Sequence, residues 1–315
     1  MGNETEKKAP RDLRRITFVA IIVGIVLAGS AIGYVSYTSW TASSSTALRA
    51  IIAGDKVTLD YIGRLPDGRV FDTSLSSVAQ NDGLYPKSLT FSLRSNSSYT
   101  PFTMTAGYYG SGGTIKGFAQ GVIGLHVGDH VVIEVPPDEG YPLVPAMITT
   151  FNVTDTIPIV DVVTESQFYS LFGKAPVAMQ VVTHPFWKWQ VLVSEVANGT
   201  VVLRNEPYIG ENVYPYGNPD AQTPTGWQIR VIGYDPNASN GAGAITIRNM
   251  VTPDDVYYVK GEDSNGNALI IWSFDEQNQT FQVHRSDSAN GYNAEVSGRT
   301  LFFEITIEKV VPGVS

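Results

Sequence analysis

The residues best suited to chemistry are a few polar side chains set among aromatic ones. Asp72 directly follows Phe71 in the run DGRVFDTS, and Tyr141 stands in a loop rich in proline and glycine. A carboxylate beside an apolar ring, and a tyrosine in such a loop, are more typical of a functional site than of packing. The chain has no cysteine, which excludes thiol catalysis, iron–sulfur clusters and cysteine-ligated zinc. These residues are therefore suited to recognition by pocket shape and hydrogen bonds.

The sequence predicts no metal site and no cofactor. The four histidines are scattered, and only His126 and His130 stand four residues apart, on either side of a Gly-Asp turn. The segment from Asp263 to Asn267 resembles the start of a calcium loop, but its glycine is misplaced and position twelve is Phe274. The run GSGGTIKG at 110–117 lacks the Gly-Lys-Ser/Thr ending of a phosphate-binding loop.

The elements that must position these residues are mostly β-strands. Residues 56–65 alternate Val57, Leu59 and Tyr61 on one face, and the following Pro-Asp-Gly predicts a hairpin turn. Helical periodicity is clear only at 117–125 and 164–173, and the second has a threonine cap and a glycine stop. We therefore expect a mostly β (α+β) fold with no visible internal repeat. Further strands are predicted at 88–95, 101–107, 130–136, 189–196, 200–206, 227–234, 243–249, 255–261, 268–274, 279–285 and 299–311.

Charge and hydropathy divide the chain at its N-terminus. The 315 residues favour about two domains, and the net charge of −9 gives no reason to expect nucleic-acid binding. Residues 1–15 carry more basic than acidic side chains. Residues 16–40 carry no charge, and this uncharged stretch is long enough for a membrane-spanning helix. The basic cluster predicts a cytoplasmic N-terminus and an outer part that begins with a tether at 41–53. A cleaved signal peptide is the alternative, although its apolar stretch is usually shorter.

Six Asn-x-Ser/Thr triplets match the acceptor pattern for N-glycosylation, although the triplet also arises by chance. They begin at Asn3, Asn96, Asn152, Asn198, Asn237 and Asn278.

Several motifs together resemble the FKBP-type peptidyl-prolyl cis-trans isomerases of archaea and bacteria. They are Tyr-x-Gly, Asp-Gly-x-x-Phe-Asp-x-Ser, Ile-x-Gly-Phe, Gly-Leu-x-x-Gly-Asp, Pro-x-x-x-Gly-Tyr and Leu-x-Phe-x-Ile, in this order within 57–142 and 298–310. The resemblance implies a curled antiparallel sheet around a short helix, over residues 54–142 and 298–312. It also implies catalysis of proline isomerisation without covalent chemistry.

The same resemblance assigns site residues. The Ile115 backbone N–H and the Tyr141 hydroxyl would bind carbonyl oxygens of the peptide. Asp72 would lie beside the twisting imide bond, with Tyr61 near it. The aromatic pocket for the proline would be formed by Phe71, Phe102, Phe118 and Phe303. Taken singly, Phe71, Phe102 and Phe303 are equally well read as the core of a small barrel.

The chain departs from the family pattern in four places. Phe118 stands where many relatives have tryptophan, and the segment from Leu75 to Thr100 and the run GYYGSGG at 107–113 are extended. Residues 143–297 form a large insertion at the flap, long enough for a β-rich domain of its own. Residues 150–207 resemble the insert-in-flap chaperone domain of some relatives, and 210–290 have no assignment. Six aromatic residues of the insertion either form an exposed surface that recognises unfolded chains or form the core of the insertion. They are Phe168, Tyr169, Phe172, Phe186, Trp187 and Trp189.

These features predict a single-pass membrane protein whose outer part isomerises proline in exported or cell-surface polypeptides and assists their folding. Its partners would be proline-containing unfolded chains and the membrane. The alternative is an FKBP-fold holdase or surface binding module with weak or no isomerase activity.

Overall fold

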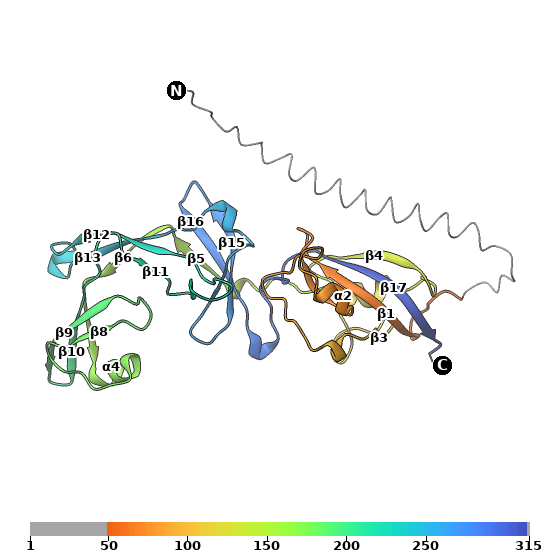
Figure 1. Cartoon of the computed structure of the whole chain (residues 1–315), viewed down its shortest axis with the longest axis horizontal. Helices are drawn as coiled ribbons and strands as arrows, with labels where there is room; N and C mark the ends of the chain where they lie inside the picture. Colours follow the sequence, from red (N-terminus) through yellow and green to blue (C-terminus); the bar gives the residue numbers. More distant parts are fainter. Residues whose placement is uncertain (1–48, 314–315) are drawn as a thin grey trace, which may run out of the picture. The chain divides into compact units, whose positions relative to one another are not determined.

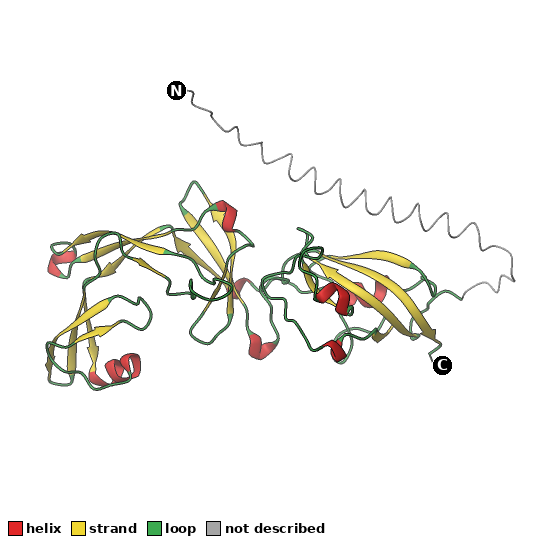
Figure 2. Ribbon diagram, in the orientation of Figure 1, coloured by secondary structure: helices red, strands yellow, loops and turns green. Residues whose placement is uncertain are grey.

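The computed structural model describes residues 49–313, which are mostly antiparallel strands with a few short helices (Figures 1 and 2). The mostly β fold expected from the sequence is therefore confirmed for this part of the chain. No helix within residues 49–313 is long and apolar enough to cross a membrane. The predicted membrane helix at 16–40, the basic segment 1–15 and most of the tether lie outside the described residues.

Five strands form the first sheet (Figure 1). They are β1 (Lys56–Arg64), β2 (Val70–Thr73), β3 (Phe102–Thr105), β4 (His130–Val135) and β17 (Leu301–Val311). The sheet order is β2, β1, β17 and β4, and β3 also pairs with β1. Every pairing is antiparallel. Strand β17, which follows the long insertion in the chain, therefore lies inside the sheet between two strands that precede the insertion.

A short helix, α3 (Lys116–Gly121), packs against β4 through two glycines. A Cβ atom on Gly117 would lie 2.7 Å from Val135 Cγ1, and one on Gly121 would lie 2.5 Å from Ile133 Cγ2. Only glycine allows the helix to approach the strand this closely. The helix is shorter than the predicted 117–125, and it buries the Phe118 side chain beneath the sheet.

Residues 88–95 form a loop, so the strand predicted there is wrong. The backbone N–H groups of Leu89 and Thr90 donate to the Glu295 carboxylate instead of to a neighbouring strand, at 2.8 and 2.7 Å. The same region contains α2 (Ser76–Ala79) and a single 3₁₀ turn, η1 (Asn96–Ser98). Before β1, Ile51 is only 1% exposed, so the folded part of the chain begins within the segment 41–53 that was predicted to be a tether.

The insertion forms three four-stranded sheets of similar construction. Each contains a short strand, a hairpin, and one strand from the segment 148–164, which we call the spine. The first sheet of the insertion contains β8 (Val181–Thr183), β9 (Gln190–Ala197), β10 (Thr200–Asn205) and β7 (Val160–Thr164). The second contains β11 (Asn212–Val213), β12 (Ile229–Asp235), β13 (Ala244–Asn249) and β6 (Thr154–Pro158). The third contains β14 (Lys260–Glu262), β15 (Ala268–Asp275), β16 (Thr280–Arg285) and β5 (Ile148–Asn152).

The spine passes from one sheet to the next at two buried residues, Val153 and Ile159. Val153 donates its N–H to the carbonyl of Gln279, directly before the last strand of the third hairpin, and its own carbonyl accepts from the N–H of Asn249, at the end of the second hairpin. Ile159 makes the equivalent bonds with Gly243 and Asn205 of the second and first hairpins. One extended segment therefore pairs in turn with the last strand of all three hairpins.

The three hairpins are copies of one structural unit, although the sequence showed no repeat. Each hairpin has a register shift at the same place, next to Val193, Val231 and Ile271. In the first, Trp189 Nε1 donates to Asn205 Oδ1 at 2.9 Å, and in the second Trp227 Nε1 donates to Asn249 Oδ1 at 3.0 Å. These asparagines in turn donate to spine carbonyls at Pro158 and Asn152. The repeat is therefore structural and has no visible period in the sequence.

The aromatic residues of the insertion mostly serve its core. Phe168 and Trp189 are at most 1% exposed, and Phe172, Phe186 and Trp187 are half-buried. The helix that carries Phe168, α4 (Glu165–Phe172), begins with a capping box at Thr164 and ends at Gly173 with a φ of 68°. Both ends agree with the prediction at 164–173. Of the six aromatic residues singled out from the sequence, only Tyr169 is exposed.

Candidate functional site

Five aromatic rings meet between α3 and the first sheet. Phe118 stacks on Phe303 with 4.5 Å between ring centroids, and on Phe102 with 6.2 Å. Tyr61 contacts these three rings, and Phe71 meets Phe303 edge to face at 5.6 Å. The strands β1, β2, β3 and β17 and the helix α3 each supply one ring. The structure therefore brings together the aromatic set expected from the sequence, as one apolar cluster.

Gly63 explains how Phe71 reaches this cluster. A Cβ atom on residue 63 would lie 2.7 Å from Phe71 Cζ, so the ring lies directly on the glycine backbone. Gly63 pairs with Asp72, the next residue after Phe71, across β1 and β2. The Tyr-x-Gly motif therefore needs glycine at residue 63, because any side chain there would collide with the Phe71 ring.

Asp72 accepts hydrogen bonds from three directions. The Tyr61 hydroxyl donates to one carboxylate oxygen at 2.6 Å, and the Arg94 guanidinium and the Thr73 backbone N–H donate to the other at 3.0 and 2.8 Å. Burial, and then the negative charge of Asp72, raise the pKa of Tyr61 well above its usual value. Tyr61 is thus held as a neutral hydrogen-bond donor, and the carboxylate is fixed at the edge of the aromatic cluster.

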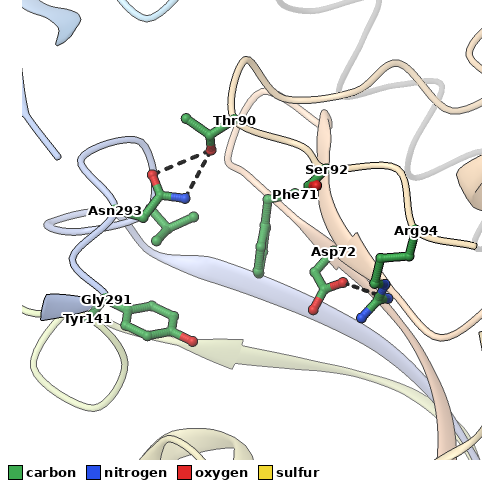
Figure 3. Close-up of a pocket in the computed structure, with 9 residues that line it drawn as sticks. Phe71, Asp72, Thr90, Ser92, Arg94, Tyr141, Gly291 and Asn293 are labelled. Carbon is green, nitrogen blue, oxygen red and sulfur yellow. Dashed lines mark hydrogen bonds and ion pairs between the residues drawn. The ribbon is translucent and has the colours of Figure 1, made fainter. Parts of the chain in front are cut away.

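Two groups on the other side of the cluster have free hydrogen-bonding capacity. Ile115 is the N-cap residue of α3, and among residues 49–313 its backbone N–H has no acceptor. The Tyr141 hydroxyl likewise has no partner in this part of the chain, and it points toward Asp72 (Figure 3). Burial, followed by the charge of Asp72, raises the pKa of Tyr141. Both groups are available as donors to a carbonyl oxygen.

A pocket of about 350 Å³ opens beside Phe71, Asp72 and Tyr141 (Figure 3). Sequence reasoning did not find the residues of its other walls, because it assigned 88–95 to a strand and placed 291–297 in the inserted domain. The additional lining residues are Thr90, Ser92, Arg94, Gly291, Asn293 and Val296. They come from the extended loop before β3 and from the segment that returns from the insertion to β17. The extension of the loop, noted from the sequence, was the one signal that pointed to Arg94.

Arg94 is held in place by its own loop. Its guanidinium lies 4.9 Å from the Tyr99 ring centroid, and its backbone N–H donates to the Tyr99 hydroxyl at 2.9 Å. The guanidinium also donates to the Thr73 carbonyl. The cation is therefore positioned against Asp72 by contacts on both of its sides.

The two pocket walls are joined by a buried carboxylate. Glu295 is 0% exposed, and it accepts from the backbone of Leu89 and from both the backbone and the hydroxyl of Thr90. The Arg69 guanidinium lies 3.3 Å from the same carboxylate and donates to the Tyr257 carbonyl at 2.7 Å. Glu295 thus ties the loop before β3 to the segment returning from the insertion.

Behind the returning segment lies a buried histidine. His284 is 0% exposed, and its Nε2 lies 2.7 Å from the Tyr292 hydroxyl, which also accepts from the Val144 backbone at 3.1 Å. Its Nδ1 atom is buried and has no partner among the described residues. Burial lowers the pKa of His284 to about 4, and the Ala294 backbone opposes this shift only in part.

Metal ligands do not converge in this part of the molecule. Within residues 49–313, no group of three histidine, aspartate or glutamate side chains could hold a metal ion. The arrangement offers an apolar floor, a fixed carboxylate and two free donors.

Comparison with known proteins agrees with this geometry. Residues 49–147 match the sequence model of the FKBP-type peptidyl-prolyl cis-trans isomerases. This segment is an FKBP-type domain. The chain is 34% identical over 96 residues to a short-type peptidyl-prolyl cis-trans isomerase of Methanocaldococcus jannaschii, covering 30% of this chain and 54% of that protein. It is 35% identical over 88 residues to FK506-binding protein 1A of Aspergillus fumigatus, covering 28% of this chain and 57% of that protein.

A third relative is FK506-binding protein 4 of Chaetomium thermophilum, 32% identical over 93 residues, or 30% of this chain and 14% of that protein. The matched part therefore spans little more than half the length of the Methanocaldococcus protein and 14% of the much longer Chaetomium protein. The matched part of the FKBP-type domain contains every site residue expected from the sequence except Phe303. That residue lies on β17, beyond the insertion, and stacks on Phe118 within the same pocket.

Proposed function

We propose that this protein is a peptidyl-prolyl cis-trans isomerase that acts on proline-containing polypeptides. The observation that carries the proposal is the aromatic cluster flanked by the fixed Asp72 carboxylate and by the free Ile115 N–H and Tyr141 hydroxyl. Rotation about a peptide bond faces a barrier of about 18–20 kcal/mol, because amide resonance must be broken. A twisted amide has less charge separation than a planar one. Moving from water to an apolar pocket therefore costs the twisted amide less than the planar one, which lowers the barrier to rotation.

Each group of the site has a role in this mechanism. The rings of Phe71, Phe118 and Phe303 would enclose the proline, while the Ile115 N–H and the Tyr141 hydroxyl hold carbonyl oxygens of the peptide. Asp72 would lie beside the rotating imide bond, with Tyr61 fixing its position. No bond is made or broken, so the mechanism needs only binding and orientation.

The test is cis-to-trans relaxation of a Xaa-Pro peptide with the full chain in detergent micelles. We expect acceleration by the wild-type chain, a strong loss with Asp72→Ala and a smaller loss with Tyr141→Phe. Asp60→Ala, which removes a carboxylate of the same strand region away from the ring cluster, serves as the matched control. A wild-type chain that is folded but leaves the relaxation rate unchanged contradicts the isomerase function.

The proposal extends to domain organisation and location. Residues 54–142 and 298–312 would form the isomerase domain and residues 143–297 an inserted β-rich domain. The uncharged stretch at 16–40 would anchor the chain in the membrane, with the basic residues 1–15 in the cytoplasm and the folded part outside. Protease digestion of intact cells tests this placement: the folded part should be cut without detergent, and its protection until the membrane is opened contradicts it.

A second function, binding of unfolded chains by the insertion, is favoured by its exposed apolar residues. Val177, Met179 and Val181 lie in and before the edge strand β8 and are 60%, 72% and 52% exposed. Runs of exposed apolar side chains on one surface are typical of recognition sites. If this run acts as a holdase, Met179→Ser should weaken suppression of aggregation by the chain and leave Xaa-Pro relaxation unchanged. Equal suppression by both chains rules out a contribution of this run.

A further inference from the structure

The tip of each repeated hairpin carries an Asn-x-Ser/Thr triplet. Asn198 lies between β9 and β10, Asn237 between β12 and β13, and Asn278 between β15 and β16. All three asparagines are exposed. Three of the five triplets within residues 49–313 thus lie in the corresponding connections of three structural copies. Asn198 and Asn278 each lie two residues before the next strand, and Asn237 lies earlier in its longer connection.

Turn geometry explains only part of this coincidence. Asn198 and Gly199 have φ angles of 52° and 76°, which is the tight two-residue turn that favours Asn-Gly. The second and third connections are longer and have different conformations, the second containing a 3₁₀ turn at Ser239–Gly241. In the third, the Asn278 amide donates to Asp275 at 2.7 Å, but among the described residues neither the Ser239 nor the Thr280 hydroxyl makes a hydrogen bond that would explain its place two positions after the asparagine.

We propose that Asn198, Asn237 and Asn278 are acceptors for N-linked glycans. In this modification the side-chain amide nitrogen bonds to the anomeric carbon of a sugar and loses one proton. The bond from that carbon to a phosphate oxygen of an activated, lipid-linked glycosyl donor breaks, the phosphate leaves with the electron pair, and the amide proton passes to solvent. The inference rests on the proposed extracytoplasmic location of the folded part, because glycan acceptors of this kind belong to surface loops of exported proteins.

The local structure leaves these asparagines accessible. Asn198 and Asn237 make no side-chain hydrogen bond to other residues in 49–313, and Asn278 donates only to the exposed Asp275, at 2.7 Å. Asn152 carries a triplet of a different kind. It lies within the spine, next to Val153, whose N–H and C=O are both bonded and whose side chain is 3% exposed. The proposal therefore covers the three tips and leaves out Asn152.

The chain offers a matched control at another hairpin tip. Asn265 and Gly266 connect β14 to β15, but residue 267 is asparagine and no hydroxyl follows. Asn265→Gln should therefore leave the glycan content unchanged, and Asn267→Thr should create a triplet and add one glycan.

The experiment is mass spectrometry of glycopeptides from the full chain purified from its own membranes. We expect a glycan on each of Asn198, Asn237 and Asn278, and each of the variants Asn198→Gln, Asn237→Gln and Asn278→Gln should lose the mass of one glycan. The wild-type measurement alone decides the proposal if a variant fails to fold.

The outcomes separate this inference from the function on which it rests. An unmodified asparagine at any tip, in a chain that external protease can reach, overturns the proposal for that tip and leaves the location intact. A chain protected from protease until the membrane is opened, with all three asparagines unmodified, overturns both the glycosylation and the location. The isomerase assay is independent of either result.

Discussion

The buried His284 makes a specific prediction about acid stability. Its imidazole lies between the rings of Trp272 and Tyr292, at centroid distances of 4.7 and 5.5 Å, and its pKa is lowered to about 4. In the unfolded chain the ring has its ordinary pKa of about 6.5. The unfolded chain therefore binds more protons than the folded one between these two values, and stability is lost as the pH falls through this window.

The size of the loss follows from the shift. With pKa values of about 6.5 unfolded and about 4 folded, this residue alone removes about 2 kcal/mol of stability between pH 7 and pH 5. The loss reaches about 3 kcal/mol at pH 4 and grows little below that, because the ring is then protonated in both states. The carboxylates of the protein add their own pH dependence, so the effect of His284 has to be isolated by comparison with a variant.

The assay is urea unfolding followed by tryptophan fluorescence at pH 7, 5 and 4, for the wild-type chain and His284→Gln. Glutamine is neutral throughout and retains a donor for the Tyr292 hydroxyl. We expect the variant to lose about 2 kcal/mol less than the wild type between pH 7 and pH 5. His126→Gln, at a half-buried residue whose ring is 40% exposed, should follow the wild-type curve. Parallel curves for wild type and His284→Gln would refute the reasoning.

Three further predictions concern the pocket and its support. Arg94→Gln breaks a half-exposed ion pair with Asp72 and should lower kcat/KM for a Xaa-Pro peptide about fivefold, corresponding to about 1 kcal/mol, and an unchanged value contradicts a positioning role for Arg94. Glu295→Gln removes the buried negative charge beside Arg69 and should destabilise the chain by roughly 3 kcal/mol in urea unfolding, against less than about 1 kcal/mol for Glu304→Gln, a control whose side chain is 32% exposed. Gly63→Ala places a methyl group against the Phe71 ring and should cost about 1–3 kcal/mol; a smaller effect shows that the ring can move aside.

The residues of the aromatic cluster could be singled out from the sequence because they lie in short motifs with strong local constraints. Tyr61, Phe71 and Phe118 lie within a few residues of glycines that the fold requires. These short spacings can be recognised in the sequence alone. The other walls could not be predicted in the same way. Leu89, Phe91 and Leu93 alternate with polar residues as in a strand, but the nearby backbone is satisfied by Glu295, which is about two hundred positions away in the chain.

The triple repeat escaped sequence reasoning for a related reason. The conserved features of the hairpins are a bulge, the pairing with the spine, and, in two of them, a Trp–Asn hydrogen bond. The connections between their strands differ in length, so Trp189 and Asn205 are closer in sequence than Trp227 and Asn249. Without a fixed period, similarity that is clear in the hydrogen bonds is not apparent along the chain.

The position of β17 has a consequence for synthesis on the ribosome. This strand lies between β1 and β4, so the first sheet has a gap until residues 301–311 have been made. The spine, in contrast, meets its partners progressively, β10 first, then β13 and then β16, as each hairpin is synthesised. The insertion can thus assemble sheet by sheet while β4 still has no strand that joins it to β1. Phe303 arrives with β17, so the aromatic pocket is completed after every other structural unit of the described chain.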